Sequence, residues 1–323
     1  MFILRIKMFL LLAVLFSILY LLVTLIGVQM GITNFYFYLT VSLFLMFIQY
    51  LLGPKIVEWA MHIKYVDKEE APELHRMVEE LAEKAHIPKP KIGISSIYLP
   101  NAFAFGHGTR NGRVCVTQGI LKLINKNELR AVLGHEISHL KNRDVLTITI
   151  LSVIPMILYR IAWHFMWFGG GRRRDERGPS TALIGLVAFI FYFVTNLLVL
   201  YASRIREYFA DLGSIRLGNH PTWLASALYK LVYGSARINR EDLREVEGLK
   251  AFFLNDPSKA SNEIYELRQL DLDMSGTIDI NELEVLRAKR IKLSFVDKLM
   301  EVLSTHPNML KRIKQLSEFS AVK

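Results

Sequence analysis

The sequence predicts a mainly α-helical integral membrane protein that also carries an α+β soluble domain with a small sheet. Of its 323 residues 52% are hydrophobic, and the mean hydropathy is +0.27, where soluble proteins usually have a negative value. Long apolar segments alternate with charged stretches of mixed helix and strand pattern. The chain is therefore long enough for several membrane spans and one folded domain.

Four apolar segments approach the roughly 20 residues that a helix needs to cross the hydrocarbon core. They are residues 8–29, 35–52, 145–168 and 182–202. The basic start at Arg5 and Lys7 is compatible with a signal peptide, but the apolar run is too long, lacks a small-residue cleavage site and is followed at once by another span. We therefore expect a retained helix, and we expect Gly53-Pro54 to end the second span.

Basic residues near the span ends predict the orientation of the chain in a cell membrane. In a four-span topology, one side would carry Arg5, Lys7, Lys55, Lys64, Lys141, Arg143, Arg204 and Arg206. This predicts a multi-pass protein with both termini and the soluble part in the cytoplasm. The loop at 169–180 disagrees, because it holds four arginines on the opposite side. Either the basic residues at the other span ends outweigh this loop in setting the orientation, or the third and fourth segments form a hairpin that does not fully cross the membrane. We favour four crossings.

The net charge of +10 suits a protein that faces anionic lipid headgroups, so the lipid bilayer is one expected partner. The charge would also suit nucleic-acid binding. The chain has no zinc-finger spacing, helix-turn-helix pattern or aromatic-basic interleaving, however, so we expect no nucleic-acid partner. The single cysteine, Cys115, gives no disulfide framework and is typical of a reducing compartment.

The segment after the second span predicts the start of the soluble domain. Apolar residues at helical spacing predict a helix over 69–86. Short strands are expected over residues 91–98, 102–106 and 113–117. Asn111-Gly112 is a strong signal for a hairpin turn before the last of them. Asn125 or Asn127 then caps a further helix.

The capped helix carries the motif His135-Glu136-Ile137-Ser138-His139. Two imidazoles four residues apart lie on one helix face, about 40° apart around the axis, so both can reach one ion. Zinc at about 2.0–2.1 Å from each nitrogen leaves room for a third protein ligand and a water. Glu136 lies beside them, placed to take a proton from that water. The alternative is a pair of solvated or core histidines on an ordinary helix, since the bare motif also occurs by chance.

A second polar cluster follows the fourth apolar segment and adds a third candidate ligand. On a helix Glu207 and Asp211 share a face, as do Arg204 and Glu207. We expect Glu207 to bind the ion, with Asp211 orienting a ligand histidine and Arg204 in a supporting position. The alternative is a juxtamembrane amphipathic helix with ordinary ion pairs, which explains Arg204 but not two carboxylates on the inward face.

The two motifs HEISHLKNRD and SRIREYFAD, with a membrane hairpin between them, resemble the HtpX family of membrane metallopeptidases, relatives of the CaaX-processing prenyl proteases. The resemblance covers nearly the whole chain and implies a zincin-like metalloprotease domain of the gluzincin type. The zinc ligands that it implies are His135, His139 and Glu207. It also implies that Glu136 is the general base and that Asp144 and Asp211 are supporting carboxylates.

Two further stretches match the family. Residues 100–106 resemble its edge strand beside the zinc, which can hold an extended substrate through backbone hydrogen bonds. The substrate-binding residues that this implies are Asn101, Ala102, Phe103 and Ala104. The stretch 304–308 resembles the family's Ser-Thr-His-Pro sequence, so His306 is expected to donate to the developing oxyanion. The alternatives are a plain sheet strand and a His-Pro turn that precedes a helix.

One loop lies outside the family pattern and fits an EF-hand calcium site. Its ligand positions are occupied by Asp271, Asp273, Ser275, Thr277, Asp279 and Glu282. Gly276 supplies the sharp turn, and helices over 262–269 and 281–290 would flank the loop. We favour Ca²⁺ over Mg²⁺ because the ligand set suits a large oxygen shell. The alternative is an acidic connecting loop that binds no ion.

The sequence therefore predicts a membrane-bound zinc metalloendopeptidase with one Zn²⁺, and a possible Ca²⁺, per chain. Its expected substrates are misfolded or damaged membrane or cytoplasmic polypeptides, as in a stress response. The alternatives are a CaaX-type processing protease and a non-catalytic scaffold with a structural metal. The expected parts are two spans (1–54), a first catalytic part (55–144), a membrane hairpin (145–203) and a second catalytic part (204–323) with an EF-hand-like insertion (262–290).

Overall fold

The computed structural model describes residues 35–168, 181–236, 267, 270–289 and 295–319. Contacts divide the chain into two units, Met1–Leu52 with Leu146–Ile205, and Gly53–Val145 with Arg206–Lys323. The expected span at 8–29, the basic loop at 169–180 and all of the expected helix at 262–269 except Leu267 lie outside the described residues.

The part of the first unit that the structure describes is helical. It contains most of α2 (Phe35–Ala60), α6 (Asp144–Phe168) and α7 (Thr181–Arg216). A core formed by α6 and α7 includes Leu151, Leu158, Ala162, Ala188 and Ala202. Other apolar side chains of α7, such as Leu186, Ile190 and Phe193, are exposed, as in a helix that faces lipid. Among the described residues, the stretches Asp144–Trp163 and Leu183–Arg216 are long and apolar enough to cross a membrane.

Helix α2 does not end at the Gly53-Pro54 pair that was expected to close the second span, but continues through both residues to Ala60. Proline lacks an N–H and costs a helix one internal hydrogen bond. The turns on either side keep theirs, so a single proline in a long helix need not stop it.

The second unit contains a four-stranded sheet with the order β1-β2-β4-β3. Its strands are β1 (Ile63–Tyr65), β2 (Lys91–Ser95), β3 (Ala102–Phe105) and β4 (Arg113–Thr117). The pair β2 and β4 is parallel, whereas β1 with β2 and β3 with β4 are antiparallel. The three expected strands are confirmed, β1 was missed, and β3 is an edge strand.

The connection from β3 to β4 differs from the expected two-residue turn. It runs from Gly106 to Gly112 and contains a short 3₁₀ helix, η1 (Thr109–Asn111). Gly112 is extended rather than left-handed. Gly106 has a φ of +136°, and a Cβ there would lie 2.2 Å from the carbonyl oxygen of Asn111. The turn therefore depends on Gly106, with a backbone that only glycine adopts without strain.

Helix α5 (Lys126–Lys141) begins with a capping box at Asn125, which settles the choice between the two expected caps. The Asn125 side chain accepts from the N–H of Glu128 at 2.9 Å, and the Glu128 carboxylate accepts from the N–H of Asn125 at 2.8 Å. The expected helix at 69–86 is confirmed as α3 (Pro72–Ala85), which ends at a left-handed His86. A short helix, α4 (Gln118–Leu123), lies between β4 and α5.

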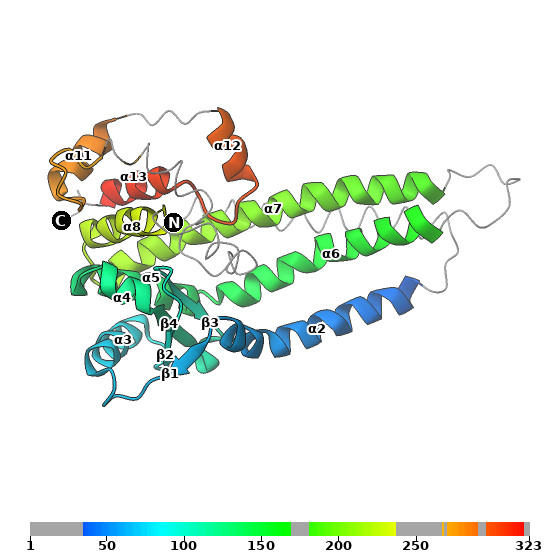
Figure 1. The fold of residues 1–323 in the computed structure, drawn as a ribbon. Helices are drawn as coiled ribbons and strands as arrows, with labels where there is room; N and C mark the ends of the chain where they lie inside the picture. Colours follow the sequence, from blue (N-terminus) through cyan, green and yellow to red (C-terminus); the bar gives the residue numbers. More distant parts are fainter. Residues whose placement is uncertain (1–34, 169–180, 237–266, 268–269, 290–294, 320–323) are drawn as a thin grey trace, which may run out of the picture. The chain divides into compact units, whose positions relative to one another are not determined.

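The core of the second unit is built in layers around α5. The helix packs against α3, β3 and α8 (Pro221–Ala236). On the far side of α8 lies α13 (Met309–Phe319), which also contacts α11 (Ile280–Ala288) (Figure 1). A further helix, α12 (Phe295–Val302), precedes α13 in the chain. The motif His135-Glu136-Ile137-Ser138-His139 thus lies on a helix that is covered on several sides, so its side chains are held in fixed directions.

Candidate metal centre

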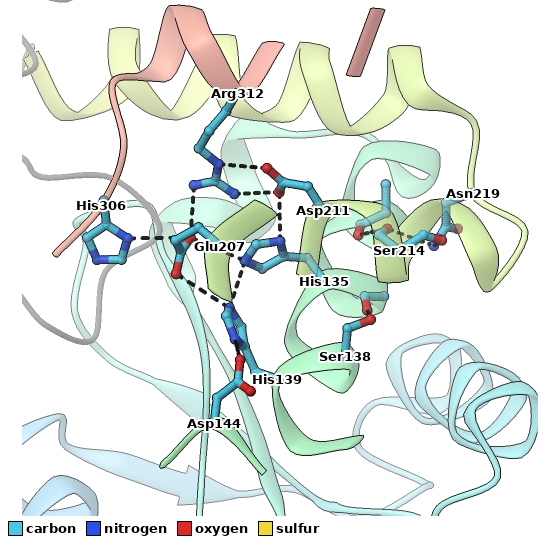
Figure 2. A network of polar contacts seen from close by, with 12 residues as sticks. His135, Ser138, His139, Asp144, Glu207, Asp211, Ser214, Asn219, His306 and Arg312 are labelled. Carbon is cyan, nitrogen blue, oxygen red and sulfur yellow. Dashed lines mark hydrogen bonds and ion pairs between the residues drawn. The ribbon is translucent and has the colours of Figure 1, made fainter. Parts of the chain in front are cut away.

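Small residues let α5 and the last turns of α7 approach closely. The Ser214 hydroxyl donates to the carbonyl of Ala131 at 2.6 Å. A Cβ on Gly134 would lie 2.3 Å from the side-chain amide of Asn219, and one on Gly213 would lie 2.3 Å from the Ser138 hydroxyl. This contact (Figure 2) brings the motif helix against the segment that follows the fourth apolar run.

The substitution Gly213→Ala is expected to lower the free energy of unfolding by about 1–3 kcal/mol, because the added methyl group overpacks the contact. Its Cβ would lie 2.6 Å from the Ser138 Cβ, which cannot move without moving α5. Gly53→Ala is the matched control, since this glycine is also helical and its added Cβ meets nothing within 4 Å. Denaturant unfolding in detergent measures both variants; equal effects would contradict the close-packing argument.

The approach of these helices brings together three candidate ligands. The Nε2 atoms of His135 and His139 lie 3.0 Å apart, and each of them lies 3.6 Å from a carboxylate oxygen of Glu207 (Figure 2). Two ligand atoms on a tetrahedral zinc ion would be about 3.3 Å apart. His135 and Glu207 are buried, where an uncompensated carboxylate would be costly. The donor set therefore fits zinc, with three protein ligands of the catalytic kind.

The other nitrogen of each imidazole contacts a carboxylate. Nδ1 of His135 lies 2.9 Å from Asp211, and Nδ1 of His139 lies 2.5 Å from Asp144. An imidazole that donates through Nδ1 presents its Nε2 lone pair to a metal, and the carboxylate holds the ring in place. The structure thus places both expected supporting carboxylates behind the ligands.

A buried arginine that the sequence analysis missed completes the cluster. Arg312 of α13 is fully buried and binds Asp211 through two nitrogens, at 3.0 Å and 2.7 Å. It also lies 3.2 Å from a carboxylate oxygen of Glu207. These carboxylates raise the pKa of Arg312 against the effect of its burial. The available signal was its position in α13, where Met309, Ile313 and Leu316 form the inward face.

Arg204, expected beside Glu207, lies in the first unit, where its guanidinium faces the ring of Tyr201. Its supporting role stays a prediction. A different arginine, Arg206, forms an ion pair with Asp144 and donates to the carbonyl of Asn142. Arg206 lies two positions after Arg204 on the same helix, α7.

The expected general base is buried beside the histidines. Glu136 has an exposed fraction of 4%, and burial raises its pKa to about 8. Its carboxylate accepts a hydrogen bond from the backbone N–H of Ala104 in β3. That N–H therefore points away from β4 and out of the sheet edge. The base therefore lies next to β3, the edge strand of the sheet among the described residues.

The remaining predicted residues fall around this centre and at a second place. Asn101, Ala102 and Phe103 have buried side chains, so these residues offer only backbone groups to a peptide. His306 has Nδ1 at 3.4 Å from Glu207. The structure also brings together Asp271, Asp273 and Glu282 of the EF-hand-like loop.

Two imidazoles and a carboxylate that converge on one point, with a buried glutamate on the same helix, define a metallopeptidase. The sequence model of Peptidase family M48 matches residues 68–320. The chain belongs to this family, and the resemblance to HtpX proteins is confirmed by its relatives.

A Protease HtpX homolog of Methanothermobacter thermautotrophicus is 49% identical over 229 residues, which cover 71% of this chain and 86% of the relative. A Protease HtpX homolog of Moorella thermoacetica is 42% identical over 224 residues, or 68% and 74% of the two chains. Among solved structures, the crystal structure of S. mikatae Ste24p matches with a TM-score of 0.48 and 17% identity. That match covers 97% of this chain and 65% of the other.

Proposed function

We propose that this metallopeptidase is a multi-pass zinc endopeptidase of the cell membrane that cuts unfolded or damaged polypeptides, membrane proteins among them, on the cytoplasmic side. The observation that carries the proposal is the contact between Glu136 and the backbone of Ala104. It puts the group that would move a proton next to a strand edge that can bind an extended peptide.

His135, His139 and Glu207 are the residues that would hold zinc. When bound, zinc polarises a carbonyl group and lowers the pKa of a water molecule, which makes peptide hydrolysis possible at neutral pH. Glu136 accepts the proton of the attacking water and passes it to the departing amine. His306, on the side of Glu207, is proposed to donate a hydrogen bond to the substrate oxygen as charge develops there.

Recognition through the edge of β3 would depend on the substrate backbone. Among the residues that the structure describes, β3 pairs with β4 alone, and the side chains of Asn101, Ala102 and Phe103 face the interior. A peptide added as a further strand would pair with backbone groups that every sequence offers. Such recognition selects segments that are already extended, which is the state of a misfolded protein and not of a folded one.

The placement at the membrane is supported by the order of the chain. The apolar run at 145–168 begins directly after Asp144, and the run at 182–202 ends shortly before Glu207. Both halves of the centre are thus joined covalently to segments of span-like composition. The basic residues at these span ends favour the cytoplasmic side for the catalytic part.

The test uses the purified full chain in detergent. With zinc it is expected to cut a permanently unfolded protein, such as reduced and alkylated casein, and not the same mass of a folded protein. A chelator should stop cleavage, and stoichiometric zinc should restore it. Zinc binding without any cleavage would favour the scaffold alternative. Cleavage confined to a prenylated C-terminal peptide would favour the CaaX-type alternative.

A further inference from the structure

The loop 271–282 lies in the second unit, directly after Leu270, and its last three residues form the first turn of α11. It turns sharply at two left-handed residues, Met274 with a φ of +56° and Gly276 with a φ of +77°. In its twelve residues, oxygen-bearing side chains occupy the EF-hand positions one, three, five, nine and twelve. Position six is glycine, and position seven supplies a backbone carbonyl. The first observation that indicates an ion site is therefore the spacing of these residues, and not the number of acidic residues.

The second observation is a buried negative charge without a cation. Ligand atoms of Asp271, Asp273 and Glu282 lie within 4.8 Å of one another. The exposed fractions of Asp271 and Glu282 are only 9% and 5%. Within the part of the chain that the structure describes, no lysine, arginine or histidine forms an ion pair with any of the three. Their oxygens accept hydrogen bonds from the backbone N–H groups of Leu272, Ser275, Gly276 and Asp279 and from the Tyr229 hydroxyl, all of them neutral donors. These bonds orient the oxygens but bring no positive charge, which a bound cation would supply.

The loop is fastened to α8, independently of any ion. The Ser226 hydroxyl accepts from the N–H of Ile278 at 2.8 Å and donates to its carbonyl at 2.9 Å. The Tyr229 hydroxyl donates to Asp271 at 2.9 Å. Ile278 is buried, together with Leu283 of α11. Because α8 supplies the contacts of the loop backbone, a single loop of this kind is held without a second one.

We infer that residues 271–282 form a calcium site, separate from the zinc centre, that joins the two ends of the loop on α8. Asp271 and Asp273 supply ligands from its start and Glu282 from its end, with oxygens of Ser275, Thr277 and Asp279 available to complete the shell. Such a set suits Ca²⁺ better than Mg²⁺, which demands a smaller octahedral site and keeps several waters. Bound calcium stabilises the layer of α8, α11 and α13, from which Arg312 reaches the zinc ligands.

The experiment measures calcium binding by isothermal titration on the zinc-loaded full chain in detergent, with Mg²⁺ as the competing ion. One Ca²⁺ per chain is expected, with a rise in the thermal unfolding midpoint that grows with calcium concentration. Glu282→Gln and Asp273→Asn are each expected to weaken binding at least tenfold. Asp273 is exposed, and asparagine can keep its bond to the N–H of Ser275, so that variant is expected to fold.

Glu284→Gln is the matched control. It makes the same change two residues along α11, on an exposed side chain outside the ligand set, and should leave calcium binding unchanged. The inference is overturned if the wild type binds no Ca²⁺, if Mg²⁺ binds as tightly as Ca²⁺, or if the three variants weaken binding equally. Zinc content and casein cleavage are read separately, so failure of this site leaves the proposed protease function standing.

Discussion

Glu136→Gln is expected to lower the rate of peptide hydrolysis by about 10²–10⁴-fold while leaving the zinc content unchanged. Glutamine has the shape of glutamate but cannot accept a proton at neutral pH. Its side-chain oxygen can still accept the hydrogen bond from the N–H of Ala104, so the contact between α5 and β3 is preserved. The candidate zinc ligands are untouched, and the loss should appear in kcat more than in KM.

The measurement compares kcat and KM on unfolded casein with zinc content by mass spectrometry. The control is Glu128→Gln, which removes the same charge from the other end of the same helix. Glu128 accepts from Lys230 at 2.7 Å and closes the capping box, so its loss should lower stability and leave kcat nearly unchanged. Full activity in the Glu136 variant would reject the proposed mechanism.

The parts of the fold that could be predicted from the sequence are those that depend on residues close together in the chain. The helix cap, predicted at Asn125 or Asn127, and the four-residue spacing of His135 and His139 are properties of one helix. They need no partner to be recognised. Strand β4 was predicted to the residue because a short run with two valines and a threonine follows the turn signal Asn111-Gly112.

Features that depend on a distant partner were missed. Strand β1 has only three residues, and it forms because β2 offers it an edge. The parallel pairing of β2 with β4 is likewise a property of two segments and not of either one. The hairpin turn was misjudged for another reason, since Asn111-Gly112 is a good turn sequence that here serves a longer connection.

The choice of arginine shows the same limit within the site. Arg204 was selected because it lies one turn before Glu207 on a single helix. Spacing along one helix cannot reveal which other element faces it. The guanidinium that contacts Asp211 belongs to Arg312, which lies 101 positions away in the chain, while the role of Arg204 stays a prediction. Asp211 lies on α7 and Arg312 on α13, so the pair forms only once these two helices have come together in the fold.

Arg312→Met is expected to lower the free energy of unfolding by about 3–5 kcal/mol, the usual cost of removing one partner of a buried ion pair. Methionine fills much of the same volume, so the loss would come from charge rather than from a cavity. It would leave Asp211 and Glu207 buried without the guanidinium that contacts both. Denaturant unfolding of the metal-free protein measures the effect.

Lys311→Met supplies the control, because this neighbour on α13 forms a partly exposed ion pair with Glu301 that should contribute no more than about 1 kcal/mol. The two variants should also respond differently to zinc. A bound cation would place positive charge beside Glu207 and, through His135, near Asp211. Saturating zinc should therefore reduce the loss in free energy of unfolding caused by Arg312→Met, and leave the loss caused by Lys311→Met unchanged. If zinc affects both variants alike, Arg312 stabilises the fold without acting on the metal centre. If zinc reduces only the effect of Arg312→Met, the guanidinium and the metal neutralise the same two carboxylates, Asp211 and Glu207. The fold of the centre then depends on the neutralisation of these carboxylates, which either group can provide.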